Sequence, residues 1–581
     1  MSDATKRAEE FLNREGGFRL GELLTESSHP KTRTLSQTAA VDLPAAIRLL
    51  QSVDDDIPPA MEKVLRQDSY RQLIEAFGEA MQTGKRIFFT GCGATGRLSI
   101  LLEAAWRRCW RIFGEVRPNL ADSVFSVMAG GDFALIKSVE GYEDFPDFGR
   151  YQLRERGVGS GDVVVAITEG GETPFVIGTA WEGLDAGAKV FFVYNNPTEL
   201  LCRHVERSRE VIAEPRITNL DLTTGPMAIT GSTRMQATTA ELFVVGSALE
   251  IALVRFLRQR SLRGCAAKLA VAEYEPGDYL GLLSELLAQL SSSESVDTLA
   301  RATKFEENIY RRQGLVTYMA DALSLDVLTD TTERSPTFML PAFRKRGDNL
   351  SPRSWAFVKD PFHPTEQAWH SLLQRPPRGL DWGDEVYKEL NVPAGVKANP
   401  PKLDNSEIYK FMIGNETDPS RTDAPDSALV AVAAGGETCR LAEMGFEKFG
   451  GAYKKTAVLI VGAGEADAGA EETFQFPCDL ADSPLKLWRH LVVKLVLNTL
   501  STATMVRMDR VIGNAMVWLS PSNKKLIDRG SRLIAQETGH SYEQACIALH
   551  KAMDEVETGQ QQGREVSSPV ALAIERLRSQ G

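Results

Sequence analysis

A short pattern occurs twice in the chain and limits the folds open to it. Residues 163–173 read VVVAITEGGET, and residues 428–438 read ALVAVAAGGET. In each copy a continuous apolar run, typical of a strand buried on both faces, ends in a Gly-Gly-Glu-Thr turn. A further apolar run follows each copy after a similar gap, at 190–194 and 457–461. Because strands that alternate with helices form parallel sheets, the repeat predicts two copies of one α/β domain.

The first copy contains a strand, a glycine-rich turn and a helix in direct succession. The apolar run 86–90 is followed by Gly-Cys-Gly-Ala-Thr-Gly at 91–96, and an amphipathic helix is predicted from about Leu98 to Trp110. Glycines let the backbone approach a ligand closely, and the free N–H groups of a helix start favour anions. The turn therefore predicts a phosphate site, to which Gly93, Thr95 and Ser99 contribute.

Two other interpretations of this turn stay open. Its Gly-x-Gly-x-x-Gly spacing also fits a dinucleotide site, although no acidic residue ends a convincing following strand to bind a ribose. A tight turn without any ligand would look the same. A Walker loop is excluded, because no Gly-Lys-Ser/Thr follows.

Two later loops extend the predicted phosphate site. Residues 229–235, ITGSTRM, precede a long apolar helix that reaches about Leu257. The loop is a second candidate anion cradle, with Ser232 and Thr233 as donors, and a plain helix N-cap is the alternative. The turn that ends the first repeat adds Thr168, Gly170 and Gly171. In parallel sheets such loops meet at the carboxyl ends of the strands.

Composition excludes several classes of function. The net charge of −12 over 581 residues argues against nucleic-acid and anionic-membrane surfaces. The seven cysteines are scattered and the seven histidines form no His-x-x-x-His pair, so we expect no metal and no cofactor. Residues 242–257 form a long apolar stretch, but Glu250 and Arg255 interrupt it, which favours a core helix over a membrane span. Without an apolar leader, the chain is expected in the cytoplasm.

Several motifs together resemble a known family. They are residues 91–98, Ala129-Gly-Gly with Glu140-Gly-x-Glu143-Asp144, residues 229–235, residues 494–502, Gly513-Asn514-x-Met516-Val517 and Ser522-Asn523-x-Lys525-Leu526. They are similar to the sugar isomerase (SIS) family that joins bacterial N-acetylmuramic acid 6-phosphate etherase and the glucokinase regulatory protein. The etherase is a homodimer with one SIS domain per chain. The regulatory protein carries two SIS domains and a helical lid in one chain, which matches the repeat.

The resemblance implies a fold class and a set of domains. The class is α/β, with two SIS-type domains, each a parallel sheet flanked by helices, and a helical lid from both termini. We expect an N-terminal helical segment at 1–49, SIS domain 1 at 50–265, SIS domain 2 at 266–485 and a C-terminal helical lid at 486–581. Residues 340–425 are rich in Pro, Asp and Arg and are expected to form surface insertions. Because the two SIS-type domains of one chain correspond to the two chains of the etherase dimer (a pseudo-dimer), we expect the chain to work as a monomer.

The positions at which the chain departs from the etherase pattern predict that catalytic activity is impaired. Of the two etherase glutamates, one corresponds to Ala105 and the other to Glu143, which is the one catalytic candidate if the chain is an enzyme. Loss of a general acid or base typically costs about 10²–10⁴ in rate. The etherase loop is followed by a Lys-Leu-Val-Leu-Asn helix, which here occurs only in the second copy, as Lys494 to Asn498. We therefore expect one composite site, with Lys494 reaching a cradle from copy one.

The leading hypothesis, implied by the resemblance, is a non-catalytic phosphosugar sensor that binds a hexose phosphate, such as fructose 6-phosphate or an amino-sugar 6-phosphate. It is expected to control a partner protein, for which a sugar kinase is one candidate. The alternative is an etherase-like lyase or a sugar-phosphate isomerase, in which Glu169 or Glu172 replaces the lost glutamate; a dinucleotide-binding protein is third. The resemblance implies that Glu333 matches a sugar-contacting glutamate of the regulatory protein. The predicted ligand contacts are Gly93, Thr95, Ser99, Glu143, Thr168, Gly170, Gly171, Ser232, Thr233, Glu333 and Lys494.

Overall fold

The computed structural model describes residues 3–113, 118–139, 141–258, 273–390, 394–435, 438–464, 469–561 and 567–580. Glu140 of the family motif and residues 436–437 of the second Gly-Gly-Glu-Thr turn lie outside the described residues, as does the predicted boundary at 265/266. The predicted domain boundaries stay predictions, and the sheets are described below by their own strands.

The first sheet has five parallel strands in the order β2-β1-β3-β4-β5. Their bounds are β1 Ile87–Gly91, β2 Val124–Met128, β3 Val163–Thr168, β4 Lys189–Tyr194 and β5 Ile217–Asp221. Every residue of β1 and β3 is buried, as their continuous apolar runs predict. The loops that follow the strands lie at one edge of the sheet, where α/β proteins bind ligands.

The second sheet repeats this arrangement in the order β10-β9-β8-β6-β7, again all parallel. Its strands are β6 Leu315–Met319, β7 Ala356–Lys359, β8 Ser427–Ala434, β9 Lys455–Val461 and β10 Glu472–Phe476. The repeated motif forms the central strand of each sheet, β3 and β8. The α/β prediction with two parallel sheets is confirmed.

The expectation that residues 340–425 are only surface insertions is wrong. The segment supplies the edge strand β7, and it includes the helix α17 Thr365–Leu373, whose Trp369 is fully buried. The segment is rich in proline and charged residues. Its composition therefore gave no signal for the short strand β7 or for the apolar face of α17.

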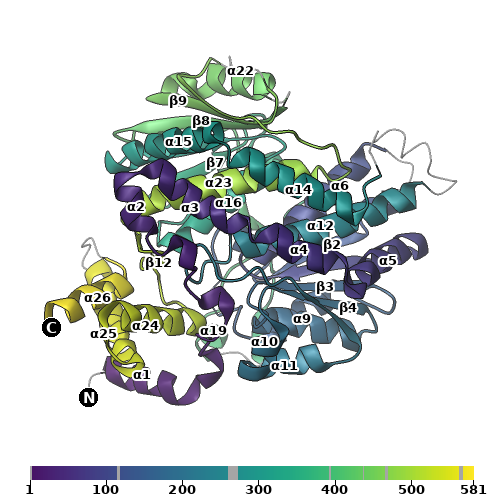
Figure 1. Cartoon of the computed structure of the whole chain (residues 1–581), viewed down its shortest axis with the longest axis horizontal. Coiled ribbons are helices and arrows are strands. Elements are labelled where there is room, and N and C mark those ends of the chain that lie inside the picture. Colours follow the sequence, from purple (N-terminus) through teal and green to yellow (C-terminus); the bar gives the residue numbers. More distant parts are fainter. Residues whose placement is uncertain are drawn as a thin grey trace.

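Long helices fill the space between the two sheets (Figure 1). They include α12 Gln236–Leu257, α16 Ser324–Phe338 and α23 Leu487–Arg507. In α12 every residue except Arg255 is buried, which explains why the helix is apolar on all faces. The predicted core helix at 242–257 is thereby confirmed. Residues 43–83 form three helices: α3 Leu43–Asp54, α4 Ile57–Leu65 and α5 Asp68–Thr83.

The two ends of the chain pack together beside the first sheet (Figure 1). The helix α1 Asp3–Arg14 lies against α25 Tyr542–Gln561, and α24 Lys524–Thr538 and α26 Pro569–Gln580 complete the group. The Asn523 side chain caps the start of α24 by accepting from Leu526 N–H, and Gly539 ends the helix in the left-handed conformation. These caps fix the helix that faces the candidate site.

Candidate functional site

A cavity of about 420 Å³ lies at the carboxyl edge of the first sheet. Its walls come from the loop after β1, the loop after β3, residues 231–234, the C-terminal end of α16 and the helix α24. Segments from both repeats and from the C-terminal helices therefore meet around one space, which is large enough for a small ligand.

The loop after β1 runs into the helix α6 Ala94–Arg111. A Cβ atom on Gly91 would lie 2.4 Å from the Thr95 carbonyl carbon, so only glycine fits there. The Thr95 hydroxyl accepts from Cys92 N–H and donates to Cys92 O, and the Ser99 hydroxyl donates to Thr95 O. These two hydroxyls stabilise the turn and do not line the cavity. No side chain caps the first turn of α6, and Gly93 and Ala94 face the space.

Arg97 on α6 lines the cavity and is only 2% exposed. One of its terminal nitrogens donates to the Ala134 and Leu135 carbonyls at 3.4 and 3.2 Å. Within the described part of the chain, no carboxylate lies within ion-pair distance of its guanidinium, and burial lowers its pKa. Beside a cavity, a buried cation that forms no ion pair, and on which Glu333 and Glu169 act only from longer distances, is the feature that an anionic ligand would stabilise. Arg97 stands in the quoted glycine-rich motif, but sequence reasoning did not select it.

The loop at 231–234 joins the two repeats. Asn514 holds its start, since the Asn514 carbonyl accepts from Thr230 N–H at 2.9 Å. Arg234 donates to Asp330 of α16 and to Ser501 and Thr502 of α23. Ser232 and Thr233 of this loop face the cavity.

Three carboxyl groups face the same cavity: Glu143, Glu169 and Glu333. Burial raises the pKa of Glu143 and of Glu333. Burial, reinforced by the Glu143 and Glu333 charges, raises the pKa of Glu169 to about 7. Glu333 is 6% exposed and has no hydrogen-bond or ion-pair partner among the residues that the structure describes. The cavity therefore combines a cationic side with an acidic side.

The helix α24 closes the cavity with two further cations, Lys525 and Arg529. The Lys525 amine lies 2.7 Å from a carboxylate oxygen of Glu172, which Arg207 also binds at 2.6 Å. Burial opposes ionisation of Glu172, but Lys525 and Arg207 hold its pKa below the ordinary value. Arg529 forms a bidentate pair with Glu26 of the N-terminal segment. Neither cation was chosen from the sequence as a ligand contact, because only the tertiary fold brings α24 to the sheet edge.

The sequence comparisons match this architecture. A model described as the glucokinase regulatory protein N-terminal SIS domain matches residues 71–182. An N-acetylmuramic acid 6-phosphate etherase of Actinobacillus pleuropneumoniae is 32% identical over 226 residues, 39% of this chain and 67% of that protein. The chain belongs to the N-acetylmuramic acid 6-phosphate etherase family. An etherase of the same name from Prochlorococcus marinus is 31% identical over 249 residues, 42% of this chain and 71% of that protein. The resemblance expected from the motifs is thereby confirmed.

The solved structures that align with this chain are less similar to it in sequence. The tagatose-6-phosphate ketose/aldose isomerase of Escherichia coli covers 81% of this chain and 94% of its own, with 9% identity and a TM-score of 0.42. The C-terminal domain of glucosamine-fructose-6-phosphate aminotransferase from Francisella tularensis has 11% identity, a TM-score of 0.41, and covers 80% and 96%.

At the etherase family's two glutamate positions the structure shows different surroundings. Ala105 is buried in the hydrophobic core, whereas Glu143 lines the cavity. The nearby Glu103 points away from the cavity into a buried ion network with Arg375 and Arg378. Burial opposes its ionisation, but these arginines lower the pKa of Glu103 to about 2. Glu103 is thus a structural ion-pair partner.

Of the predicted ligand contacts, five line the cavity: Gly93, Glu143, Ser232, Thr233 and Glu333. The other six do not: Thr95, Ser99, Thr168, Gly170, Gly171 and Lys494. Thr168 is fully buried and its hydroxyl pairs with that of Thr173 at 3.0 Å. A Cβ on Gly171 would lie 2.5 Å from Leu201, so this glycine serves packing. Whether the eleven bind a ligand stays a prediction.

Lys494 reaches the first repeat at a different point from the one expected. Its amine donates to the Arg234 and Met235 carbonyls and to the side chains of Thr239 and Asn498, at 2.9–3.1 Å. Burial lowers its pKa to about 8. It lines a smaller cavity of about 40 Å³, which Ala94, Arg97 and Glu333 also border. In the structure Lys494 holds the loop and does not face the larger space.

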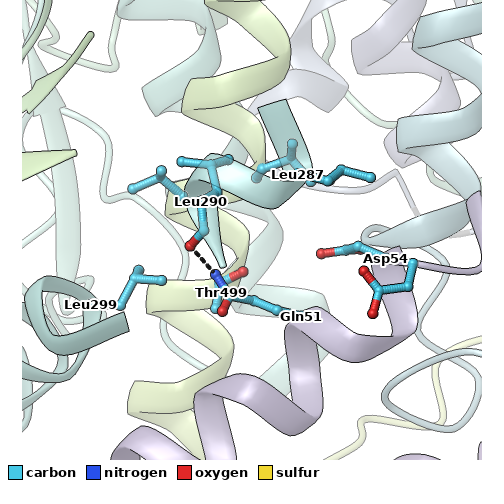
Figure 2. A pocket seen from close by; sticks show the side chains of 9 residues that line it. Gln51, Asp54, Leu287, Leu290, Leu299 and Thr499 are labelled. Atoms are coloured by element: carbon cyan, nitrogen blue, oxygen red, sulfur yellow. Dashed lines mark hydrogen bonds between the residues drawn. The ribbon is translucent and has the colours of Figure 1, made fainter. Parts of the chain in front are cut away.

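A third cavity, drawn in Figure 2, holds about 10 Å³ and lies between α3, α23 and the helices α14 Pro276–Leu290 and α15 Ser293–Arg311. Gln51 donates across it to the Leu290 carbonyl at 2.8 Å. Its volume suits a single water, so it is no sugar site. Among the described residues no cluster of His, Cys, Asp and Glu suits a metal ion, and no described helix could span a membrane.

Proposed function

We propose that the chain is a phosphosugar-binding regulatory protein, with the cavity between α6, loop 231–234 and α24 as its ligand site. The observation that carries the proposal is Arg97, a buried guanidinium without a carboxylate partner in the described chain, at the wall of that cavity. The uncapped start of α6 and the Ser232 and Thr233 hydroxyls would add donors to a phosphate group.

The lid supplies a route from ligand to partner. Lys525 and Arg529 line the cavity from α24, and the opposite face of that helix packs against α25 and α26. A ligand that changes the contacts of these two cations would shift the position of α24 and therefore the surface of the terminal helices. By analogy with the glucokinase regulatory protein, we propose that a sugar kinase binds the surface so controlled, and that one chain suffices.

A lyase remains the second candidate, because Glu169 provides an unexpected acid beside Glu143. With a pKa of about 7, Glu169 would be poised for general acid–base chemistry. Glu172 does not fit this role, since Lys525 and Arg207 keep it ionised. D-lactate release from N-acetylmuramic acid 6-phosphate tests this candidate, with Glu143→Gln as the blank. Release at enzyme-like rates would establish a lyase; no release would support the regulator.

The regulator is tested by titrating hexose phosphates in a calorimeter and in thermal melts. Ligand at about 100 times its Kd should add about 2.7 kcal/mol of apparent stability. Arg97→Met should weaken binding at least tenfold, while Arg66→Met, which removes an exposed arginine outside the cavity, should change it less than threefold. The melt of each free variant shows whether it is folded. Binding unchanged in folded Arg97→Met would refute the assigned site.

A further inference from the structure

The charges around the cavity do not balance for an ordinary hexose phosphate. Three of its lining cations, Lys525, Arg529 and Arg234, already contact carboxylates, which are Glu172, Glu26 and Asp330. Arg97 and the exposed Lys137 are the other lining cations. Against them stand the three carboxyls Glu143, Glu169 and Glu333. A phosphate dianion would add further negative charge to this space, where like charges repel strongly.

One carboxyl of the acidic side, that of Glu169, occurs only in the first copy of the repeat. The repeat aligns Glu169 with Ala434, so the second copy carries no carboxyl at this position. Apart from its own backbone N–H, Glu169 has no hydrogen-bond donor in the described residues, and it lies within electrostatic range of Lys525 and of both Glu143 and Glu333. Glu333, more than nine-tenths buried, also lines the cavity and forms no hydrogen bond or ion pair among the described residues, although the charges of Arg97, Arg234 and Lys494 act on it from a longer distance. Two carboxylates without donors at the wall of a cavity are acceptors that a ligand can complete.

From this geometry we propose that the ligand is an amino-sugar phosphate with a free, protonated amine, and that Glu169 and Glu333 receive its ammonium group. The inference rests on the proposed phosphosugar site and names its ligand class. The ammonium would donate charge-assisted hydrogen bonds to the acidic side, while Arg97 and the start of α6 hold the phosphate.

The same geometry disfavours related ligands. An N-acetylated amine carries no charge, so both carboxylates would remain without a counter-ion. A sugar that bears a lactyl carboxylate in addition to phosphate would bring a third negative charge toward the acidic side. A site whose buried acceptors are built for a particular donor rejects analogues that lack it by large factors.

The test is calorimetric titration of the full chain with glucosamine 6-phosphate, N-acetylglucosamine 6-phosphate and glucose 6-phosphate. These probes differ at one substituent, which is an ammonium, an acetamide or a hydroxyl. We expect the amine to bind at least tenfold more tightly than the other two. Glu169→Gln should reduce this preference below threefold without weakening glucose 6-phosphate, whereas the exposed Glu199→Gln should leave the preference unchanged.

The outcomes separate this inference from the function on which it rests. If all three probes bind with equal affinity, the amine inference is refuted and the phosphosugar site stands. A preference for the amine that survives both Glu169→Gln and Glu333→Gln also refutes it. The inference is supported if the two probes without an amine bind, and if Glu169→Gln strengthens their binding while it weakens the binding of glucosamine 6-phosphate. If no probe binds, the proposed function and the inference both fail.

Discussion

Replacing Glu26 by glutamine should loosen the contact between the N-terminal segment and the lid helix α24. Glu26 is 4% exposed and accepts from Arg529 at 2.6 and 2.9 Å and from Arg532 at 2.7 Å. Burial opposes its ionisation, but the two arginines lower its pKa from 4.5 to about 2. At 1.36 kcal/mol for each tenfold change, this corresponds to about 3 kcal/mol in favour of the folded state. Breaking a buried ion pair by removing one partner costs a similar amount, about 3–5 kcal/mol.

The pH dependence provides the sharper readout. Since the folded-state pKa is depressed, the contribution of Glu26 is complete above about pH 4.5 and disappears as the pH falls toward about 2. Pulse proteolysis in a urea series, with cleavage in α24–α26 as the signal, would measure the difference between wild type and Glu26→Gln. The difference should be about 3 kcal/mol at pH 7 and should shrink below pH 4.5.

The control is Glu22→Gln, an exposed carboxylate of the same segment, which should change stability by less than about 0.5 kcal/mol. A Glu26→Gln difference below about 1 kcal/mol at pH 7, or one that is as large at pH 3 as at pH 7, would refute the assigned role of the ion pair.

Two further substitutions test how the cavity is held. Gly231→Ala should destabilise the packing of α24 by at least about 1–2 kcal/mol, because φ at Gly231 is +76° and the new Cβ would lie 2.4 Å from Arg529 Nε. The measurement is the rate of proteolysis within α24, which should rise. An unchanged rate would contradict the prediction. Lys494→Met should lower global stability by about 1–3 kcal/mol, since buried acceptors lose their donor, yet change sugar-phosphate affinity less than threefold. Loss of affinity with unchanged stability would instead support the direct phosphate contact expected from the sequence.

Sequence reasoning located the strands β1, β3, β4, β8 and β9, and it located the cavity in part. The apolar runs that predict β3, β4, β8 and β9 are local signals, because a strand buried on both faces requires apolar residues along its whole length. Short elements are weaker signals, which is why β7 was missed inside a polar segment. The glycines of the turns were also identified from the sequence. In the structure, however, Gly91 and Gly171 are required because neighbouring atoms leave no room for a Cβ.

Side chains that converge on the cavity from distant parts of the chain were predicted less well. Glu143 and Ser232 could be placed because family motifs carry them. Lys525 and Arg529 belong to a helix that is nearly 300 positions further along than loop 231–234, and nothing local indicates which cations of α24 face that loop. Lys494 was expected at the phosphate because a lysine suits that role, but its amine is instead taken up by main-chain carbonyls.

The sequence by itself determined that this protein has two copies of a parallel α/β unit, a glycine-rich turn after the first strand and one intact etherase-type glutamate. These properties are encoded in contiguous stretches, where periodicity and turn chemistry act over a few residues. Only the tertiary structure decided which charges have partners. Arg97 is left without a carboxylate, Lys525 is paired with Glu172, and Glu169 and Glu333 remain acceptors, because ion pairing depends on distances that packing sets between elements far apart in the chain.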